Sequence, residues 1–218
     1  MSTIRRGWLA LALGVCLTGL SCAAPSARTT ALDLYLTDLA TLRTNFSQSL
    51  TDSHGRALES LYGTLVVLRP GRFRWEVRPV GAASTATQLM IADGRNVWFY
   101  DRDLEQVTVK ASDAALTATP AMLLAGSVEL RQVFSVAAAA RAQGLDWVLV
   151  KPLRSDAEFR EAQLGFAGSE LRSMVIKDKL GQTARFVFSS SVRNAPVSTA
   201  EVSFTPPAGV DVIGTPAR

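Results

Sequence analysis

Histidine and cysteine are almost absent from this 218-residue chain, which has one His and two Cys. Cys16 and Cys22 both lie in the first 24 residues, so the rest of the chain has no thiol for a disulfide, a nucleophile or a metal site. His54 alone excludes a multi-histidine zinc site and disfavours a Ser-His-Asp triad. The sequence also lacks a glycine-rich phosphate loop and a nucleophile elbow. We therefore expect no catalytic residues, no metal and no cofactor.

Acidic residues offer the one alternative that would make this protein an enzyme. Asp101, Asp103 and Glu105 are close in sequence, and a pair of carboxyl groups can in principle perform acid–base catalysis. They flank a predicted hairpin turn, where acidic side chains in solvent are expected. The sequence therefore favours a protein that is not an enzyme.

The first 24 residues have the layout of a secretory signal peptide. Met1–Arg6 is short and basic, Gly7–Leu20 is almost unbroken apolar sequence, and small residues follow. The apolar run is too short for the ~20 residues of a membrane-spanning helix. We expect cleavage between residues 23 and 27, which leaves residues 25–218 as one exported domain. The alternative is a lipoprotein with Cys22 as its acylated first residue.

Removal of this leader changes the charge of the protein. The full chain has a net charge of +4, and loss of Arg5 and Arg6 leaves 21 basic against 19 acidic residues, which is about +2. A small charge on an exported protein argues against a nucleic-acid partner.

After the leader, one helix precedes a long series of strands. Thr30 and Asp33 form a capping-box pattern, and apolar residues then recur at helical spacing from Leu32 to Leu42. Asp93-Gly94 is a strong hairpin signal. Segments with strand composition, separated by turn residues, are 43–51, 57–68, 72–78, 85–92, 96–101, 106–110, 147–150, 159–166, 171–177, 184–190 and 200–204. The pattern predicts a mainly β protein with a few helices (α+β).

The strand pattern stops between Ala111 and about Phe134. Thr119 suits a helix N-cap, Pro120 the first helical position and Gly126 the position after the last. A single antiparallel sheet of about 10–11 strands must curve strongly, and short helices could fill its concavity as a lid over an unclosed β-barrel. Such a fold could enclose an apolar ligand, or it could contain an ordinary filled core.

The most unusual stretch is Leu65–Glu76, in which an Arg-Pro-Gly turn interrupts an apolar strand pair. If the turn preserves the alternation of faces, Arg69 lies at the rim of the face that carries Leu65, Val67, Phe73 and Trp75. A guanidinium there needs acceptors, and the C-terminal carbonyls of a lid helix would suit it. The alternative is an arginine at a strand end that extends into water.

At these residues the chain resembles the LolA family of periplasmic lipoprotein carriers. The matching segments, in order along nearly the whole chain after the leader, are the 32–42 helix with Asn45-Phe46-Ser47-Gln48, then 68–75, 92–94 with 97–101, 104–107, 119–124, 178–183 and 204–210. The resemblance implies an unclosed β-barrel with a helical lid. It also implies carriage of acylated lipoproteins as a monomer, from the inner-membrane ABC release complex to the outer-membrane receptor LolB.

The resemblance also implies roles for individual residues. Arg69 would hold the lid shut in the unloaded protein, with Leu36 of the first helix facing it, and Phe73 would belong to the lipid-binding face. Residues expected to line the lipid cavity, each of which could equally be an ordinary core residue, are Leu65, Val67, Phe73, Trp75, Met90, Trp98, Met122 and Leu123. The alternative within this fold is a LolB-like receptor, itself a lipoprotein, or a lipid-sensing domain.

Overall fold

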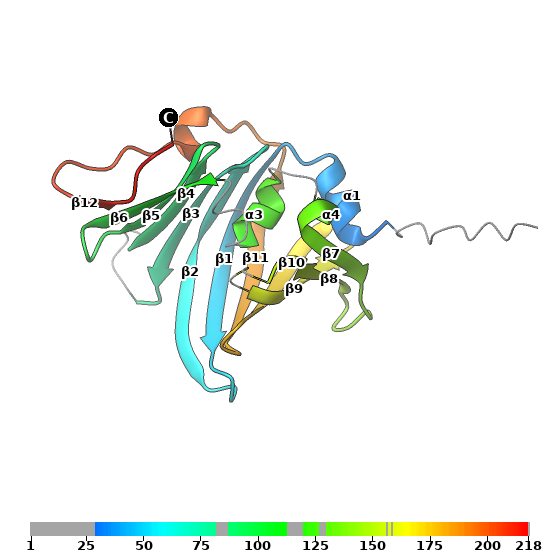
Figure 1. The fold of residues 1–218 in the computed structure, drawn as a ribbon. Helices are drawn as coiled ribbons and strands as arrows, with labels where there is room; N and C mark the ends of the chain where they lie inside the picture. Colours follow the sequence, from blue (N-terminus) through cyan, green and yellow to red (C-terminus); the bar gives the residue numbers. More distant parts are fainter. Residues whose placement is uncertain are drawn as a thin grey trace, which may run out of the picture.

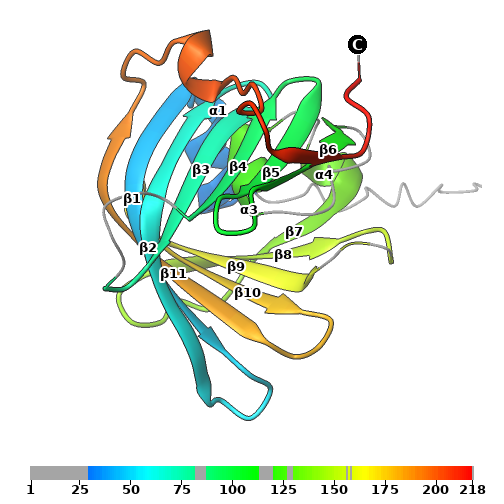
Figure 2. The same ribbon diagram turned by 90° about the vertical axis from the view of Figure 1, so that its left-hand side faces the viewer.

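The computed structural model describes residues 29–81, 87–112, 120–126, 130–155, 157 and 159–217. One twelve-stranded sheet contains every named strand, in the spatial order β12-β6-β5-β4-β3-β2-β1-β11-β10-β9-β8-β7. Figures 1 and 2 show that this sheet curves around the helices α1, α3 and α4. The strands β12 and β7 lie at the two edges, so the barrel is not closed. The expected curved, unclosed sheet with helices in its concavity is confirmed.

Neighbouring strands pair antiparallel except β12, which runs parallel to β6. The bounds are β1 (Thr41–Thr51), β2 (Ala57–Leu68), β3 (Arg72–Pro79), β4 (Gln88–Asp93), β5 (Asn96–Asp101), β6 (Gln106–Ala111), β7 (Phe134–Ala138), β8 (Asp146–Pro152), β9 (Phe159–Ala167), β10 (Glu170–Asp178), β11 (Thr183–Arg193) and β12 (Asp211–Ile213).

Ten of the eleven predicted strands are present, and the prediction for residues 200–204 is wrong. Thr199–Val202 is a short 3₁₀ helix, η1, in which the Glu201 carboxylate accepts a hydrogen bond from the Ser198 backbone at 2.8 Å. This local cap outweighs the strand composition. The strands β7 and β12 were not predicted, because one is rich in alanine and the other has three residues.

The first helix is shorter than its apolar stripe. The helix α1 (Ala31–Thr37) begins with the expected capping box between Thr30 and Asp33, and it ends before β1. Leu42 therefore belongs to β1, where it is buried opposite Val67. Because α1 and β1 both face the core, the apolar spacing continues across the boundary between them. The lid region contains α3 (Pro120–Ala125) and α4 (Leu130–Val133), and Gly126 follows α3 with a φ of +54°.

The two faces of the sheet carry separate apolar clusters. The large cluster fills the concave side, with residues from β1, β2, β3, β10 and β11 packed against α1 and α3. The smaller cluster lies on the convex side of β4, β5 and β6 and consists of Leu89, Ile91, Trp98, Val107 and Val109. Phe204, just after η1, covers it, with its ring centroid 5.6 Å from that of Trp98. Alternation along each strand assigns neighbouring residues to different clusters.

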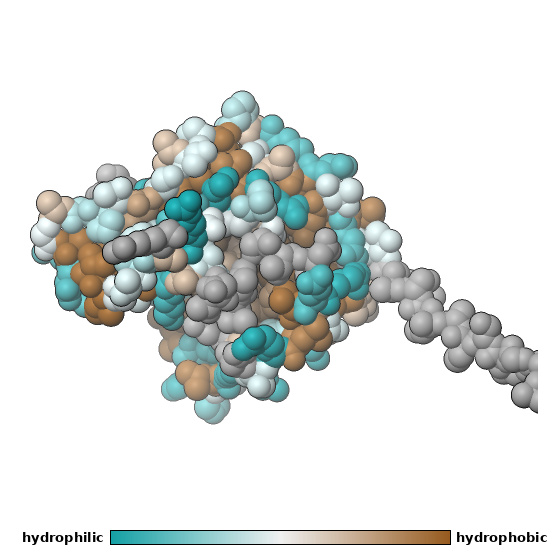
Figure 3. All heavy atoms as spheres, turned by 45° about the horizontal axis from the view of Figure 1, so that its top comes forward, coloured by the Kyte–Doolittle hydropathy of each residue, from teal (hydrophilic) through white to brown (hydrophobic). Residues whose placement is uncertain are grey.

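Seen from above, the described surface mixes hydrophobic and hydrophilic side chains, and hydrophobic ones gather at the left end of Figure 3. That end carries β6 and β12 (Figure 1), and Val212 and Ile213 of β12 are exposed.

Some sequence predictions cannot be compared with the structure. The leader, its cleavage region at 23–27 and the N-cap Thr119 lie outside the described residues. Among the helices that are described, none has the length and apolar character needed to cross a membrane.

Gly63 of β2 tests the close packing of the concave face. A Cβ atom there would lie 1.9 Å from the Glu76 carbonyl oxygen and 2.6 Å from Phe46 Cζ, so backbone would have to move. We expect Gly63→Ala to lower the free energy of unfolding by about 2–3 kcal/mol in urea denaturation, in the range of overpacked cores. Ser60→Ala, exposed on the same strand, should change it by less than about 0.5 kcal/mol. Equal stabilities for the two variants would contradict this packing.

Candidate functional site

The helix α3 fills one end of the concave face. Ala121, Met122, Leu123, Leu124 and Ala125 are all buried, and the helix packs against β2 and β3 (Figure 1). Such a short helix, apolar on all sides, depends on its surroundings for stability. The side chains of the sheet in the same cluster include Leu65, Val67 and Phe73, each fully buried.

Arg69 lies where α1, α3 and the sheet meet. Its Nη1 donates to the Leu36 carbonyl oxygen at 2.5 Å and to the Leu39 carbonyl oxygen at 3.3 Å. These oxygens belong to the C-terminal end of α1 and the residues just after it, where carbonyls lack helical partners and carry partial negative charge. Arg69 thus holds α1 through two backbone acceptors, and it contacts Leu36 through the carbonyl of that residue.

The same arginine also lies against the end of α3. A Cβ atom at Gly126 would be 2.6 Å from Arg69 Nη2 and 3.0 Å from its Nε, so any side chain there would displace the guanidinium from its present position. The positive φ of Gly126 is also the left-handed conformation that commonly ends a helix. Beside it, the Gly71 backbone N–H donates to the Ala125 carbonyl oxygen at 3.0 Å. The Arg69-Pro70-Gly71 turn therefore connects α1 and α3 to the sheet.

Burial lowers the pKa of the Arg69 guanidinium below its usual value, and the group remains charged at neutral pH. A half-buried charge of this kind is costly without acceptors. Displacing α1 from Arg69 would therefore leave the guanidinium without these two acceptors, whereas the Leu36 carbonyl would still accept from the Leu39 backbone N–H.

A second arginine, which sequence reasoning missed, holds α1 from the other side of β1. Arg193 at the end of β11 donates from Nη2 to the Tyr35 carbonyl oxygen at 2.9 Å, and its Cζ lies 4.6 Å from the centre of the Tyr35 ring. Burial raises the pKa of the Tyr35 hydroxyl to about 12, although the charge of Arg193 acts in the opposite direction. An arginine at a strand end carries no sequence signal for such a contact.

The start of α1 is bound to α4. Arg131 donates from Nη2 to Asp33 Oδ2 at 2.7 Å, and the same oxygen accepts from the Thr30 backbone N–H at 2.7 Å. Burial acts to raise the pKa of Asp33, but the hydrogen bonds from Thr30 and Arg131 lower it on balance. The helix α1 is thus attached at its start to α4 and at its end to Arg69 and Arg193.

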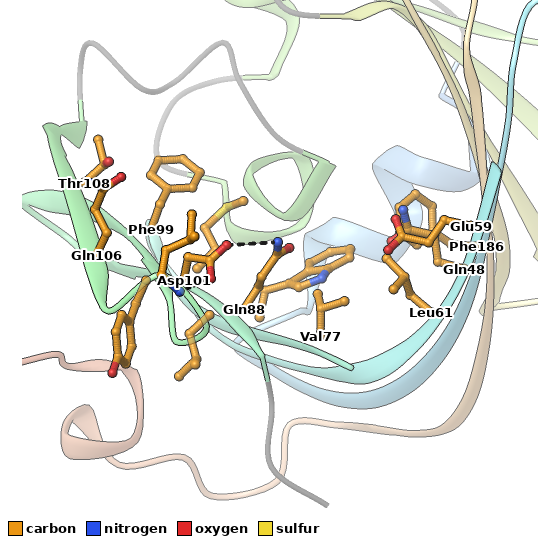
Figure 4. A pocket seen from close by; sticks show the side chains of 15 residues that line it. Gln48, Glu59, Leu61, Val77, Gln88, Phe99, Asp101, Gln106, Thr108 and Phe186 are labelled. Atoms are coloured by element: carbon orange, nitrogen blue, oxygen red, sulfur yellow. Dashed lines mark hydrogen bonds between the residues drawn. The ribbon is translucent and has the colours of Figure 1, made fainter. Parts of the chain in front are cut away.

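A cavity of about 530 Å³ lies on the concave side of the sheet (Figure 4). It includes Glu59 and Leu61 near the start of β2, whereas Arg69 follows the end of that strand. Its volume falls within the range of about 300–1,000 Å³ typical of small-molecule sites. The residues that line it come from β1 to β6, β11 and the β5–β6 turn: Gln48, Glu59, Leu61, Trp75, Val77, Gln88, Leu89, Met90, Phe99, Tyr100, Asp101, Leu104, Gln106, Thr108 and Phe186.

The predicted lining residues fall into three groups. Trp75 and Met90 line this cavity. The second group belongs to the filled core around α3 and comprises Leu65, Val67, Phe73, Met122 and Leu123.

Trp98 alone lies elsewhere, and its predicted place in the cavity is wrong. It belongs to the convex cluster, and its Nε1 donates to Asp93 Oδ2 at 2.7 Å. The neighbours Val97 and Phe99 face the concave side instead, as strand alternation requires.

Sequence reasoning missed several residues that line the cavity. The apolar residues among them include Leu61, Val77, Phe99 and Phe186. The alternation of faces places Val77 on the same side as Trp75, and Phe99 lies opposite Met90 in the neighbouring strand, so the sequence pattern could have identified these two. Phe186 comes from β11, and only the register of β1 with β11 brings it beside Gln48.

Asp33 provides a test of how α1 is held. Asp33→Asn should lower the free energy of unfolding at pH 7 by about 1 kcal/mol, since it weakens the cap and removes the charge that faces Arg131. The native pKa of Asp33 is lowered, so its contribution exists above the unfolded-state value of 3.8 and is lost as the pH falls through the native pKa. The stabilities of variant and wild type should therefore converge in strong acid.

The matched control for this variant is Asp38→Asn, at the exposed opposite end of α1, which should not lower stability. Denaturation curves at several pH values give the answer. A stability loss in Asp33→Asn that is the same at pH 7 and at pH 2 would contradict the role of the carboxylate.

Comparisons with known proteins agree with this architecture. The model of the family described as outer membrane lipoprotein carrier protein LolA matches residues 37–205. A protein of Dechloromonas aromatica named outer-membrane lipoprotein carrier protein is 38% identical over 180 residues, which cover 83% of this chain and 84% of that protein. A protein of the same name from Bordetella pertussis is 36% identical over 216 residues, 98% of this chain and 99% of its own length.

Among solved structures, an uncharacterized conserved protein from Thermus thermophilus superposes with a TM-score of 0.51. The match covers 84% of this chain and 96% of the other at 16% identity, so it supports the fold alone. The family model and the two relatives cover most of the chain at substantial identity. The chain therefore belongs to the LolA family of outer-membrane lipoprotein carrier proteins.

Proposed function

We propose that residues 25–218, freed of the N-terminal leader, act in the periplasm as a carrier of acylated lipoproteins. The carrier takes lipoproteins from the inner-membrane ABC release complex and gives them to the outer-membrane receptor LolB. The observation that supports this most is an apolar concave face covered by helices that a half-buried arginine holds in place. The names of the relatives support the same cargo and favour a carrier over a LolB-like receptor or lipid sensor.

The binding surface consists of the cavity and the side chains under α3. Trp75, Met90 and Phe99 line the cavity on the concave side, so a ligand can contact them there without movement of α3. Leu65, Val67 and Phe73 are fully buried in the cluster that contains α3, so they reach acyl chains only when α3 moves away. Loading thus requires the loss of lid contacts.

This requirement suits a carrier that must release its cargo. Burial of acyl chains contributes ~0.8 kcal/mol per CH₂ group, so a freely open apolar face would hold several chains too tightly. The contacts of Arg69 with the Leu36 and Leu39 carbonyls favour the covered state and are lost on loading. They lower the net affinity for cargo by the free energy needed to break them. Transfer to a receptor then becomes favourable without an energy source.

Arg69→Leu tests whether the hydrogen bonds from Arg69 to the Leu36 and Leu39 carbonyls, here called the clamp, hold the lid in place. The variant loses the hydrogen bonds to the α1 carbonyls, so we expect it to retain lipoproteins more strongly and to transfer them to a receptor at least about tenfold more slowly, the effect of roughly 1.4 kcal/mol. Transfer from purified loaded protein to receptor-containing vesicles measures this. Arg185→Leu, at an exposed position of β11, is the control and should transfer at the wild-type rate. Equal rates for Arg69→Leu and wild type would refute the clamp.

Release from membranes tests the carrier function itself. Purified protein beginning after the leader is mixed with spheroplasts that contain an active release complex, and lipoproteins in the soluble fraction are identified. We expect the lipoproteins to appear in a complex with the carrier. The variant Asp146→Asn, in β8 near the edge of the sheet, should release them as the wild type does. Absence of released lipoproteins would defeat the carrier function.

The N-terminus decides between carrier and receptor. A free amine at the N-terminus, found by mass spectrometry of the exported protein, is expected for a carrier. An acylated Cys22 would support the receptor alternative.

A further inference from the structure

The two ends of the concave face differ in polarity. Near Arg69 the sheet is apolar and covered, with Leu65, Val67 and Phe73 in the cluster that contains α3. The opposite end contains the starts of β2, β4 and β6 and the ends of β1, β3 and β5, as their antiparallel pairing requires. The cavity lies at this second end.

Six of the residues that line the cavity are polar or acidic. They comprise three glutamines, two carboxylates and a threonine: Gln48, Gln88, Gln106, Glu59, Asp101 and Thr108. Among the described lining residues there is no lysine, arginine or histidine. The cavity therefore offers many hydrogen-bond acceptors and two negative charges, with no positive charge on its wall to balance them.

These polar groups are distributed along the cavity and do not form one cluster. In Figure 4, Gln106 and Thr108 lie at one end, Glu59 and Gln48 at the other, and Gln88 and Asp101 between them. Gln88 Nε2 donates to Asp101 Oδ2 at 3.4 Å. The cation Lys110 lies near this region, with its Nζ 5.9 Å from the centre of the Phe99 ring, but it is not a lining residue.

The concave face is apolar near α3 and polar at the cavity, so an amphiphile would fit it in one orientation. Its acyl chains would lie on the apolar side chains and extend toward α3, and its headgroup would stay among the glutamines and carboxylates. Carboxylate and amide oxygens accept hydrogen bonds from N–H and O–H groups, and the two carboxylates repel a phosphate in the same place.

We propose that this polar end selects the headgroup of the cargo. It accepts the uncharged amide and peptide groups of an acylated N-terminal cysteine, and Glu59 and Asp101 disfavour the anionic phosphate of phospholipids. The proposal rests on the proposed function, because it assumes that acyl chains occupy the concave face.

Such selection answers a problem that an apolar cavity cannot solve. Lipoproteins and the phospholipids around them carry similar acyl chains, and burial of those chains gives nearly the same free energy in either case. Discrimination then needs an element that repels the wrong ligand. In this protein that element is the pair of carboxylates on the cavity wall, Glu59 and Asp101.

The test compares two probes with identical acyl chains. One is a synthetic palmitoylated cysteinyl lipopeptide with an uncharged peptide, and the other is dipalmitoyl phosphatidylglycerol. The double variant Glu59→Gln and Asp101→Asn removes both charges and keeps the Asp101 Oδ1 position that accepts from the Asp103 and Leu104 backbones. We expect its affinity for phosphatidylglycerol to rise about threefold to tenfold, the Coulomb effect of two nearby charges. Its affinity for the lipopeptide should stay the same or fall.

Two controls make this result specific. Asp146→Asn with Glu161→Gln removes two charges from ion pairs on the β8–β9 part of the sheet and should leave both affinities unchanged. The preference of the wild type should also shrink between low salt and about 0.5 M salt, because screening weakens repulsion at a partly open site.

The outcomes separate the two proposals. Unchanged phosphatidylglycerol binding in the double variant, or an equal rise in the control, would overturn headgroup selection while lipid carriage stands. Failure of the wild type to bind either probe would overturn lipid carriage and headgroup selection together.

Discussion

The contact between the Arg69 guanidinium and the carbonyls that end α1 is the interaction on which the arrangement of the lid depends. One side chain reaches the acceptors of Leu36 and Leu39 and at the same time lies against Gly126 at the end of α3. The next residues of its own turn bind α3 through Gly71. Because these contacts share a single turn, movement of either helix disturbs the hydrogen bonds of the other, and the two helices are expected to move together.

Other contacts of α1 connect it to β11 and α4 as well. Arg193 of β11 donates a hydrogen bond to the Tyr35 carbonyl, and Arg131 of α4 forms an ion pair with Asp33 of the capping box. The lid is thus held mainly by backbone carbonyls and partly exposed ion pairs, while the sheet is held by continuous ladders of strand pairing. Contacts of the first kind are individually weak and reversible, so the lid can change state while the sheet stays folded.

Much of the fold could be predicted from the sequence because local signals agree with it. The segments at Ala57–Leu68 and Asn96–Asp101 were predicted to the residue, since turn chemistry marks both of their ends. The need of a charge beside an apolar face for acceptors drew attention to Arg69 but also allowed a guanidinium in water, and only the resemblance to the LolA family implied its contact with the lid. Trp98 was misplaced because its strand carries apolar residues on both faces. The contacts of Arg193 and the position of Gln48 beside Phe186 depend on the pairing of strands far apart in the chain, which no local pattern encodes.

The central claim is that cargo reaches the apolar face only when α3 leaves it, and hydrogen–deuterium exchange measures this most directly. The Gly71 amide donates to the Ala125 carbonyl in the covered state. On addition of an acylated lipopeptide, the amide of Gly71 and those of residues 121–126 should exchange faster, while the amides that pair β1 with β2 keep their protection. Binding of the lipopeptide with unchanged or slower exchange at Gly71 would contradict the account.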